Sequence, residues 1–421
     1  MSPFDSRPAY DRLFPGMIEN RDEVKSALLV IPYEDVNDTV LRSEELEALV
    51  DTMGLKSSGC VTFRIREYSS ATMLGSGQVE ELKENILYHE CDCVVFDTSL
   101  SPRILRNLEA ALDCCVIDRE EVILQIFADR ARTREAKLQV ALARAEYSLP
   151  RLRRRWESLS QQRGGVKGSR GAGERQLELD RRALSERITV LKRELEEVKR
   201  VRNVQRASRS RSSTYSFALV GYTNAGKSSL LNLLTSSDIL AEDRLFATLD
   251  PTTRTMKLRN RVEVTLTDTV GFVSNLPHHL ISAFSSTLEE AKYANTLIIV
   301  IDMANPACEQ CYETTLEVLE SLGAGDHDRI VVFNKMDAVA SDIALSRLRV
   351  AIPDHIEISV REKTGIGELS DAMWKKAVTG RTEKTFSIDP SDGRALSELY
   401  RSYTVIGTEY RDGMLDVRVL T

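Results

Sequence analysis

One short stretch constrains the fold of this chain more than any other. Residues 221–228 read GYTNAGKS and match the pattern G-x-x-x-x-G-K-[ST]. The stretch follows the apolar run FALV and precedes the helical run SLLNLL, so it joins a predicted strand to a predicted helix. Glycines let such a loop wrap phosphate groups, and its backbone N–H groups converge at a helix N-terminus. The pattern therefore predicts a phosphate-binding loop in an α/β nucleotide-binding domain.

Two side chains of this loop and one later motif predict the ligand. Lys227 brings a positive charge to the β- and γ-phosphates, and the hydroxyl of Ser228 is suited to Mg²⁺, the expected cofactor. Residues 334–337 read NKMD and follow the strand-like run RIVVF. The Asp337 carboxylate can accept hydrogen bonds from N1–H and the exocyclic amine of guanine, whereas adenine offers no such pair of donors. We therefore expect a GTP/GDP site, which argues against a general P-loop ATPase that remodels RNA.

Strand and helix patterns alternate in the first 130 residues and again from Ser216 onward. This alternation is typical of α/β domains with largely parallel sheets. In the first part we expect strands at 26–32, 61–68, 93–97 and 114–118, and helices at 44–53, 79–89 and 102–112. In the second part we expect strands at 217–221, 262–268, 297–302, 330–334 and 355–359. A helix over 395–400 and a β-hairpin of 403–409 with 414–420 follow, because Tyr-Arg-Asp-Gly between the last two runs is a turn signal.

The middle of the chain has a different pattern. Apolar residues three and four positions apart run over 138–159 and again over 177–198. They predict an antiparallel helical hairpin with arms reaching about 40 Å and a kink at Pro150. Glycine costs a helix about 1 kcal/mol relative to alanine, so the tip glycines should interrupt the two helices. These are Gly164, Gly165, Gly168, Gly171 and Gly173.

The same segment is strongly basic. Residues 151–210 hold 18 Lys and Arg against 8 Asp and Glu, although the whole chain has a net charge of −7. A concentrated positive charge is typical of a nucleic-acid contact. The alternative is a solvated helix pair without a partner.

The expected fold class is α/β, with four domains. A small α/β domain (1–130) and an antiparallel helical hairpin with a Gly/Arg-rich tip (131–210) precede a P-loop GTPase domain (211–382) and a small C-terminal helix plus β-hairpin (383–421). No apolar run approaches the roughly 18 residues that span a bilayer, so we expect no membrane span. Seven cysteines, an odd count, favour a reduced cytoplasm over a disulfide framework.

The phosphate loop and NKMD together resemble the P-loop GTPase superfamily. Residues 268–271, DTVG, are similar to its D-x-x-G motif, and SVR at 359–361 stands where it has a base-contacting loop. The resemblance implies that Asp268 holds the hydration shell of Mg²⁺ and that the Gly271 amide contacts the γ-phosphate. The expected metal ligands are Ser228, Thr248 and Asp268. The expected GTP-binding residues are Gly221, Tyr222, Thr223, Asn224, Ala225, Gly226, Lys227, Ser228, Ser229, Phe246, Ala247, Thr248, Leu249, Asp250, Asp268, Thr269, Val270, Gly271, Asn334, Lys335, Met336, Asp337, Ser359, Val360 and Arg361.

The resemblance also bears on hydrolysis. A switch threonine should close on the metal: spacing from Ser228 and similarity to other ribosome-associated GTPases favour Thr248, with Thr252 as the alternative. Phe272 stands where signalling GTPases carry a water-orienting Gln. Phenylalanine cannot orient water, so we expect slow hydrolysis that depends on a group supplied in trans, unless a neighbouring residue replaces Gln unaided. No residue is assigned as general base; Lys227 and Thr248 are the expected transition-state stabilisers.

A larger part of the chain, roughly residues 60–380, resembles the HflX family of translation-associated GTPases. The resemblance rests on FATLDPTTR, DTVGF and NKMD, on GSGQVEEL at 75–82, and on RGGVKGSRGAGERQLELDRR at 163–182, which is similar to the family's helical tip. Arg175 stands where the family usually has Thr, and Lys167 is additional, so both add charge. Gln78 replaces a Lys often found there, and a tight turn entering a helix is the simpler interpretation of GSGQ than a second nucleotide site.

The resemblance implies a cytoplasmic, ribosome-stimulated GTPase that binds the large ribosomal subunit and its RNA and splits stalled or stressed ribosomes. Tip glycines would let the backbone approach folded RNA closely, while cationic side chains contact phosphates or stack on bases. The alternative is a GTP-switched RNA or ribosome-assembly adaptor in which hydrolysis only times release. We expect a monomer. The expected RNA contacts are Arg163, Lys167, Arg170 and Arg175.

Overall fold

The computed structural model describes residues 25–34, 39–152, 170–210, 214–235, 245–246, 248–259, 262–274, 277, 280, 290–379, 383–411 and 413–420. The chain divides into two compact units, one of residues 1–129 with 140–190 and one of 130–139 with 191–421. Helices α6 (Arg134–Ser148) and α8 (Arg170–Ser210) each contribute residues to both units. The four domain boundaries expected from the sequence stay a prediction.

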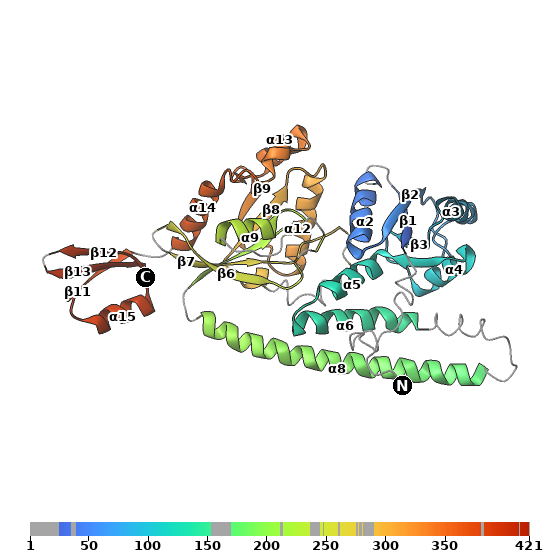
Figure 1. The fold of residues 1–421 in the computed structure, drawn as a ribbon, viewed down its shortest axis with the longest axis horizontal. Coiled ribbons are helices and arrows are strands. Elements are labelled where there is room, and N and C mark those ends of the chain that lie inside the picture. Colours follow the sequence, from blue (N-terminus) through green and yellow to red (C-terminus); the bar gives the residue numbers. More distant parts are fainter. Residues whose placement is uncertain are drawn as a thin grey trace. The chain divides into compact units, whose positions relative to one another are not determined.

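The first unit contains a four-stranded sheet in the order β2-β1-β3-β4, and every pair in it is parallel (Figure 1). This arrangement confirms the expected small α/β domain with a parallel sheet. Apolar side chains of β1, β3 and β4 form a buried core with helices α3 and α4. The strands are β1 (Ser26–Tyr33), β2 (Lys56–Arg64), β3 (Cys93–Phe96) and β4 (Cys115–Asp118). The helices are α2 (Thr39–Met53), α3 (Ser76–His89), α4 (Pro102–Leu112) and α5 (Arg119–Arg130).

Two elements of this unit differ from the sequence prediction. Strand β2 covers residues 56–64 rather than 61–68, because its polar first half pairs with β1 at the sheet edge, where ladder hydrogen bonds rather than hydrophobicity define the strand. Helix α5 was not predicted. Most of its residues are buried, charged ones included, so it lacks the amphipathic period by which a surface helix is recognised.

The helical hairpin is unequal. Helix α6 ends at Ser148, and Pro150 lies in the 3-10 turn that follows, so the α-helix ends just before the proline where a kink was expected. Helix α8 has 41 residues, which corresponds to about 60 Å at 1.5 Å per residue. It begins at Arg170, so Gly171 and Gly173 lie inside the helix, and the prediction that all five tip glycines interrupt it is wrong for these two. The other three tip glycines lie outside the described residues.

The second unit is built on a six-stranded sheet in the order β10-β9-β8-β5-β7-β6, parallel except for β6. The carboxyl ends of its parallel strands share one edge, which is where ligands bind in doubly wound sheets. Strand β6, a polar edge strand, was not predicted. The strands are β5 (Tyr215–Val220), β6 (Thr252–Lys257), β7 (Glu263–Asp268), β8 (Thr296–Asp302), β9 (Asp328–Asn334) and β10 (Ile356–Glu357). The described helices of this part are α9 (Lys227–Thr235), α12 (Cys308–Ser321), α13 (Asp342–Ala351) and α14 (Ile366–Val378).

The C-terminal residues form a three-stranded antiparallel sheet in the order β11-β13-β12. The predicted hairpin of β12 and β13 and the predicted helix are confirmed, whereas β11 was not predicted. Leu415, Val417 and Val419 on one face of β13 form its buried centre. The elements are β11 (Glu383–Ile388), α15 (Gly393–Ser402), β12 (Thr404–Arg411) and β13 (Met414–Leu420). No helix among the described residues is both long and apolar enough to cross a bilayer.

Candidate nucleotide site

The backbone of the phosphate loop needs glycine at both ends. Gly221 has a φ of 143° and Gly226 a φ of 92°, which side chains other than glycine rarely adopt. A Cβ on Gly221 would lie 2.3 Å from the carbonyl oxygen of Val300, and one on Gly226 would lie 2.4 Å from Nδ2 of Asn334. The loop therefore packs against the ends of two neighbouring strands, β8 and β9.

Lys227 and Asp268 place opposite charges in the buried floor of the site. The side chain of Lys227 donates to the carbonyl oxygens of Gly221 and Tyr222, at 3.1 and 2.7 Å. Burial lowers the pKa of Lys227 to about 8, against the opposing effect of Asp268. Burial likewise raises the pKa of Asp268, against the effects of Lys227 and two hydroxyl donors. Both charges are poorly solvated, so a phosphate anion beside the lysine and a cation beside the aspartate would each favour the charged form.

Three predicted metal ligands converge here. Oδ2 of Asp268 accepts from the hydroxyls of Ser228, at 2.6 Å, and Thr248, at 2.9 Å, and the two hydroxyls are 2.9 Å apart. The other oxygen, Oδ1, is buried and has no hydrogen-bond partner among the described residues. Oxygen donors with an open acceptor are what Mg²⁺ requires, so these residues fit the metal. Thr252, the alternative switch threonine, lies in β6 opposite Asp268 and has no hydroxyl bond to this cluster in the described part of the chain.

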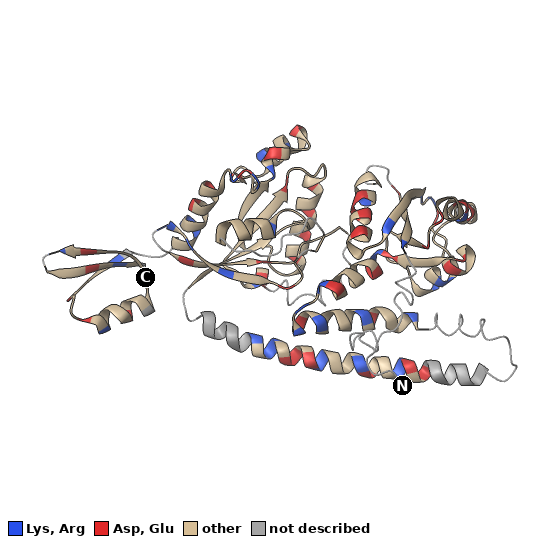
Figure 2. Ribbon diagram, viewed as in Figure 1, with Lys and Arg blue, Asp and Glu red and all other residues tan. Residues whose placement is uncertain are grey.

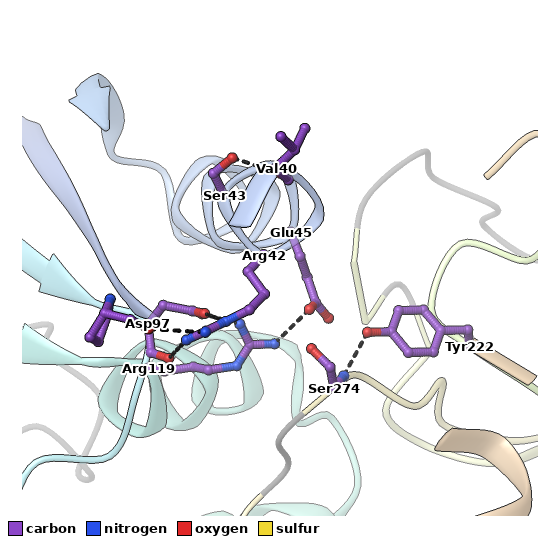
Figure 3. A network of polar contacts seen from close by, with 9 residues as sticks. Val40, Arg42, Ser43, Glu45, Asp97, Arg119, Tyr222 and Ser274 are labelled. Carbon is purple, nitrogen blue, oxygen red and sulfur yellow. Dashed lines mark hydrogen bonds and ion pairs between the residues drawn. The ribbon is translucent and has the colours of Figure 1, made fainter. Parts of the chain in front are cut away.

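The DTVG segment is joined to the phosphate loop by backbone bonds. The Thr223 amide donates to the Phe272 carbonyl at 2.7 Å, and the Phe272 amide donates to the Gly221 carbonyl at 3.1 Å. The Phe272 side chain is only 1% exposed, so its ring belongs to the core. The Ser274 amide donates to the Tyr222 hydroxyl at 2.6 Å, a contact seen in Figure 3 that the sequence did not suggest.

The predicted base-binding residues form one network. Nδ2 of Asn334 donates to the Ala225 carbonyl at 2.9 Å, and Oδ1 of Asn334 accepts from the Val360 amide at 3.3 Å. The Ser359 hydroxyl donates to Asp337 at 2.6 Å, and this bond is the largest cause that lowers the pKa of Asp337. Arg361, with its side chain 82% exposed, lies 3.9 Å from the same carboxylate. An ionised acceptor is thereby held in place by the loop that Asn334 joins to the phosphate loop.

Lys335 has a partner that the sequence did not identify. Its ammonium group lies 2.7 Å from Oδ2 of Asp302, and its backbone is left-handed with a φ of 61°. Asp302 is the last residue of β8, and its position as a polar residue at the end of a buried strand could have identified it as a site residue.

Several other predicted site residues have contacts outside the metal and base clusters or are buried. The Thr269 hydroxyl donates to the Leu219 carbonyl at 2.7 Å and so belongs to the sheet. The side chains of Phe246 and Leu249 are each 2% exposed. The carboxylate of Asp250 is bonded to the start of α6 and not to any other predicted site residue in the described structure. Ala247, Arg163 and Lys167 lie outside the described residues, as do the side chains of Arg170 and Arg175 in α8.

A second polar cluster lies at the carboxyl edge of the N-terminal sheet (Figure 3). Asp97, directly after β3, is 1% exposed and accepts from the guanidinium groups of Arg42 and Arg119. Arg119 also pairs with Glu45 at 3.0 Å. Asp118, the last residue of β4, accepts from Tyr147 at 2.9 Å and Arg151 at 3.2 Å, and from the amides of Leu100 and Glu121 at 3.0 and 2.9 Å. The chain's own donors therefore occupy both carboxylates.

The GSGQ segment of the same unit is a helix start. The Gly75 amide donates to Oε1 of Gln78 at 3.0 Å, and Nε2 of Gln78 donates to the Arg64 carbonyl at 3.0 Å. Gln78 thus caps α3 and ties it to the end of β2, which agrees with the interpretation of GSGQ as a tight turn.

Comparison with known proteins gives three matching families in succession along the chain. Residues 41–128 match "GTP-binding GTPase N-terminal", residues 130–209 match "GTP-binding GTPase Middle Region", and residues 216–335 match "50S ribosome-binding GTPase". A protein named GTPase HflX from Treponema denticola is 52% identical over 346 residues, covering 80% of this chain and 87% of its own. Another GTPase HflX, from Akkermansia muciniphila, is 44% identical and covers 93% of both chains.

Among solved structures, a GTP-binding protein from Sulfolobus solfataricus in complex with GDP is 26% identical. The match covers 84% of this chain and 99% of that one, with a TM-score of 0.44.

Proposed function

The chain belongs to the HflX family and is a GTPase, and from this premise we propose that it binds GTP with Mg²⁺ at the phosphate loop and acts on the large ribosomal subunit. Stalled or stressed ribosomes are the proposed target, and their splitting the proposed outcome. The observation that carries the nucleotide site is the convergence of Lys227, Ser228, Thr248 and Asp268 at one edge of the sheet. We also propose that the protein acts in the cytoplasm and as a monomer.

In this site each side chain has one task. Lys227, freed from the loop carbonyls, would neutralise the β- and γ-phosphates; the hydroxyl oxygens of Ser228 and Thr248 would bind Mg²⁺, and Asp268 would hold its hydration shell. The metal, when bound, supplies charge neutralisation for the leaving phosphate. Gly271 must remain small, because a Cβ there would lie 2.7 Å from the backbone Cα of Thr223. Its amide is then free to approach the γ-phosphate.

Hydrolysis is proposed to be slow until a group is supplied in trans. Water attacks the γ-phosphate, and no side chain among the expected site residues serves as general base, because phosphoryl transfer depends chiefly on positioning and charge stabilisation. Phe272 has its ring in the core, which supports the view that it does not orient water. The large ribosomal subunit is the proposed source of the missing group.

Two features support the ribosomal partner. Residues 216–335 match the family described as "50S ribosome-binding GTPase", and residues 151–210 carry 18 Lys and Arg against 8 Asp and Glu. Along its described length α8 carries both signs (Figure 2). RNA contact is therefore assigned to the tip, through Arg163, Lys167, Arg170 and Arg175.

The experiment is steady-state GTP hydrolysis with and without purified large ribosomal subunits, across a salt series. We expect strong stimulation that falls as salt increases, because phosphate contacts are weakened by counterions. Replacing residues 163–175 with a Gly-Ser linker should preserve GTP binding and weaken subunit binding. Absence of stimulation despite intact GTP binding would favour the alternative, a GTP-switched adaptor in which hydrolysis only times release.

A further inference from the structure

The loop that carries the switch threonine is held at Thr248 and at Asp250, with one residue between them. Thr248 meets Ser228 and Asp268 through its hydroxyl, as described above. Leu249, the next residue, is 2% exposed. Asp250 then turns its carboxylate to the start of helix α6, 117 residues away in the sequence. The loop therefore connects the proposed metal ligands directly to the first arm of the helical hairpin.

The contact at α6 is specific in its chemistry. Oδ2 of Asp250 accepts from the backbone amides of Arg132 and Thr133, both at 3.1 Å, and Oδ1 accepts from the Thr133 hydroxyl. That hydroxyl in turn accepts from the Ala136 amide at 3.1 Å, so Thr133 is the N-cap of α6. An anion at this position is favoured by the unpaired amides and the dipole of the helix N-terminus. Residues 130–139 and 250 belong to the same compact unit.

We propose that Asp250 is a positioning residue that holds Thr248 on the metal side of the site and couples the start of α6 to the presence of the γ-phosphate. The inference rests on the proposed function, since it takes Thr248 as a ligand of Mg²⁺. Two extended residues span about 7 Å, so Thr248 cannot withdraw far while Asp250 stays bonded to α6.

The coupling acts in both directions. Bound GTP with Mg²⁺ would hold Thr248 beside Ser228 and Asp268 and would thereby keep the contact of Asp250 with Thr133 closed. GDP, which lacks the γ-phosphate, does not need Thr248, so the Asp250 contact has little effect on its affinity. By linkage, if GTP increases the equilibrium constant for the Asp250–Thr133 contact by some factor, breaking that contact lowers the affinity for GTP by the same factor.

The test compares the affinity of the full-length protein for a non-hydrolysable GTP analogue with its affinity for GDP, both with Mg²⁺. We expect Asp250→Ala and Thr133→Val each to weaken analogue binding about 5- to 10-fold, with GDP binding changed less than 2-fold. Thr133→Ser, which keeps the hydroxyl, should restore the analogue affinity. GDP binding serves as the check that each variant is folded.

The chain offers a matched control in Asp92. Its carboxylate accepts from the amides of Lys25 and Ser26, at 2.8 and 2.9 Å, and from the Ser26 hydroxyl at 2.9 Å, which is the same set of donors in the other unit. Asp92→Ala should leave both nucleotide affinities unchanged. An equal loss of analogue and GDP affinity in the Asp250 and Thr133 variants, or no loss of analogue affinity, would overturn the proposal.

A parallel variant separates this inference from the proposed function. If Thr248→Val does not weaken analogue binding selectively, the assignment of Thr248 to the metal fails, and the role of Asp250 fails with it. If Thr248→Val weakens analogue binding but Asp250→Ala does not, only the coupling through Asp250 is wrong.

Discussion

The two parallel sheets of this protein place acidic residues at the same topological position and use them differently. In the N-terminal sheet, Asp97 follows β3 and Asp118 ends β4, and both are bound by side chains or backbone amides of the chain itself. In the GTPase sheet, Asp268 ends β7 with one buried oxygen that no described residue satisfies. A carboxyl edge of parallel strands is thus not a ligand site in itself. In this protein the proposed ligand site lies at the edge where one buried carboxylate oxygen has no hydrogen-bond partner among the described residues.

The largest effect should come from removing the cation of the second sheet. Lys227→Met should lower GTP hydrolysis by about 10³-fold, because the charge that meets the phosphates is lost. Stability without nucleotide should change by no more than about 1 kcal/mol, because burial already disfavours the charged form of Lys227 and this offsets the loss of its attraction to Asp268. Phosphate release and thermal unfolding measure the two effects. Turnover within tenfold of the parent would contradict the assignment.

The matching substitution in the first sheet should have the opposite pattern. Arg119→Met leaves Asp97 with one cation and Glu45 without the pairing to Arg119, and breaking such a buried pair costs about 3–5 kcal/mol. GTP hydrolysis per folded molecule should be unchanged. Urea unfolding with parallel turnover measurements checks both points. A loss of turnover as large as that of Lys227→Met would mean that the two sheets are not functionally distinct.

A third change concerns the Asp337 carboxylate, which we expect to bind the guanine base. Asp337→Asn should weaken GTP binding about 10²-fold and improve binding of xanthosine triphosphate, because the amide can donate where the carboxylate only accepts. Competition binding with both nucleotides gives the ratio. Unchanged selectivity would show that Asp337 does not contact the base.

The smallest effect should come from one hydroxyl of α6 that contacts the first sheet. Tyr147→Phe removes the donor to Asp118 and Glu121, at 2.9 and 3.1 Å, and should cost about 1–2 kcal/mol. Burial raises the pKa of Tyr147 well above its usual value of 10.0, so the folded state keeps a proton that the unfolded chain loses. This stability is present below pH 10 and is lost as the pH rises towards the folded pKa, so the difference between parent and variant should shrink above pH 10. Chemical unfolding at pH 8 and pH 10.5 measures it; a gap that widens at the higher pH would refute the assignment.

The comparison also shows what the sequence could predict. The buried strands and the GYTNAGKS and NKMD motifs are local patterns, so their positions and the α/β class were predictable. The pairing of Asp97 with Arg42 and Arg119 joins three separate segments, and no spacing rule reveals it. The edge strands β6 and β11 were not predicted for a related reason, because hydrogen bonds to the neighbouring strand, rather than hydrophobicity, define them. Asp250 was grouped with the nucleotide site by its neighbours, and only the fold shows that its side chain is bonded to α6.

The side chain of Asn334 has a consequence for how such a protein can evolve. It bonds the phosphate loop on one side and the SVR loop on the other, and Gly226 has no room for a Cβ against it. A substitution of Asn334 would therefore disturb the phosphate loop and the SVR loop together, so a change of nucleotide preference through this residue would weaken the binding of both nucleotides. Selection on single substitutions should therefore retain Asn334, and nucleotide preference can change more readily at a neighbour such as Asp337, whose carboxylate is bonded to Ser359 instead.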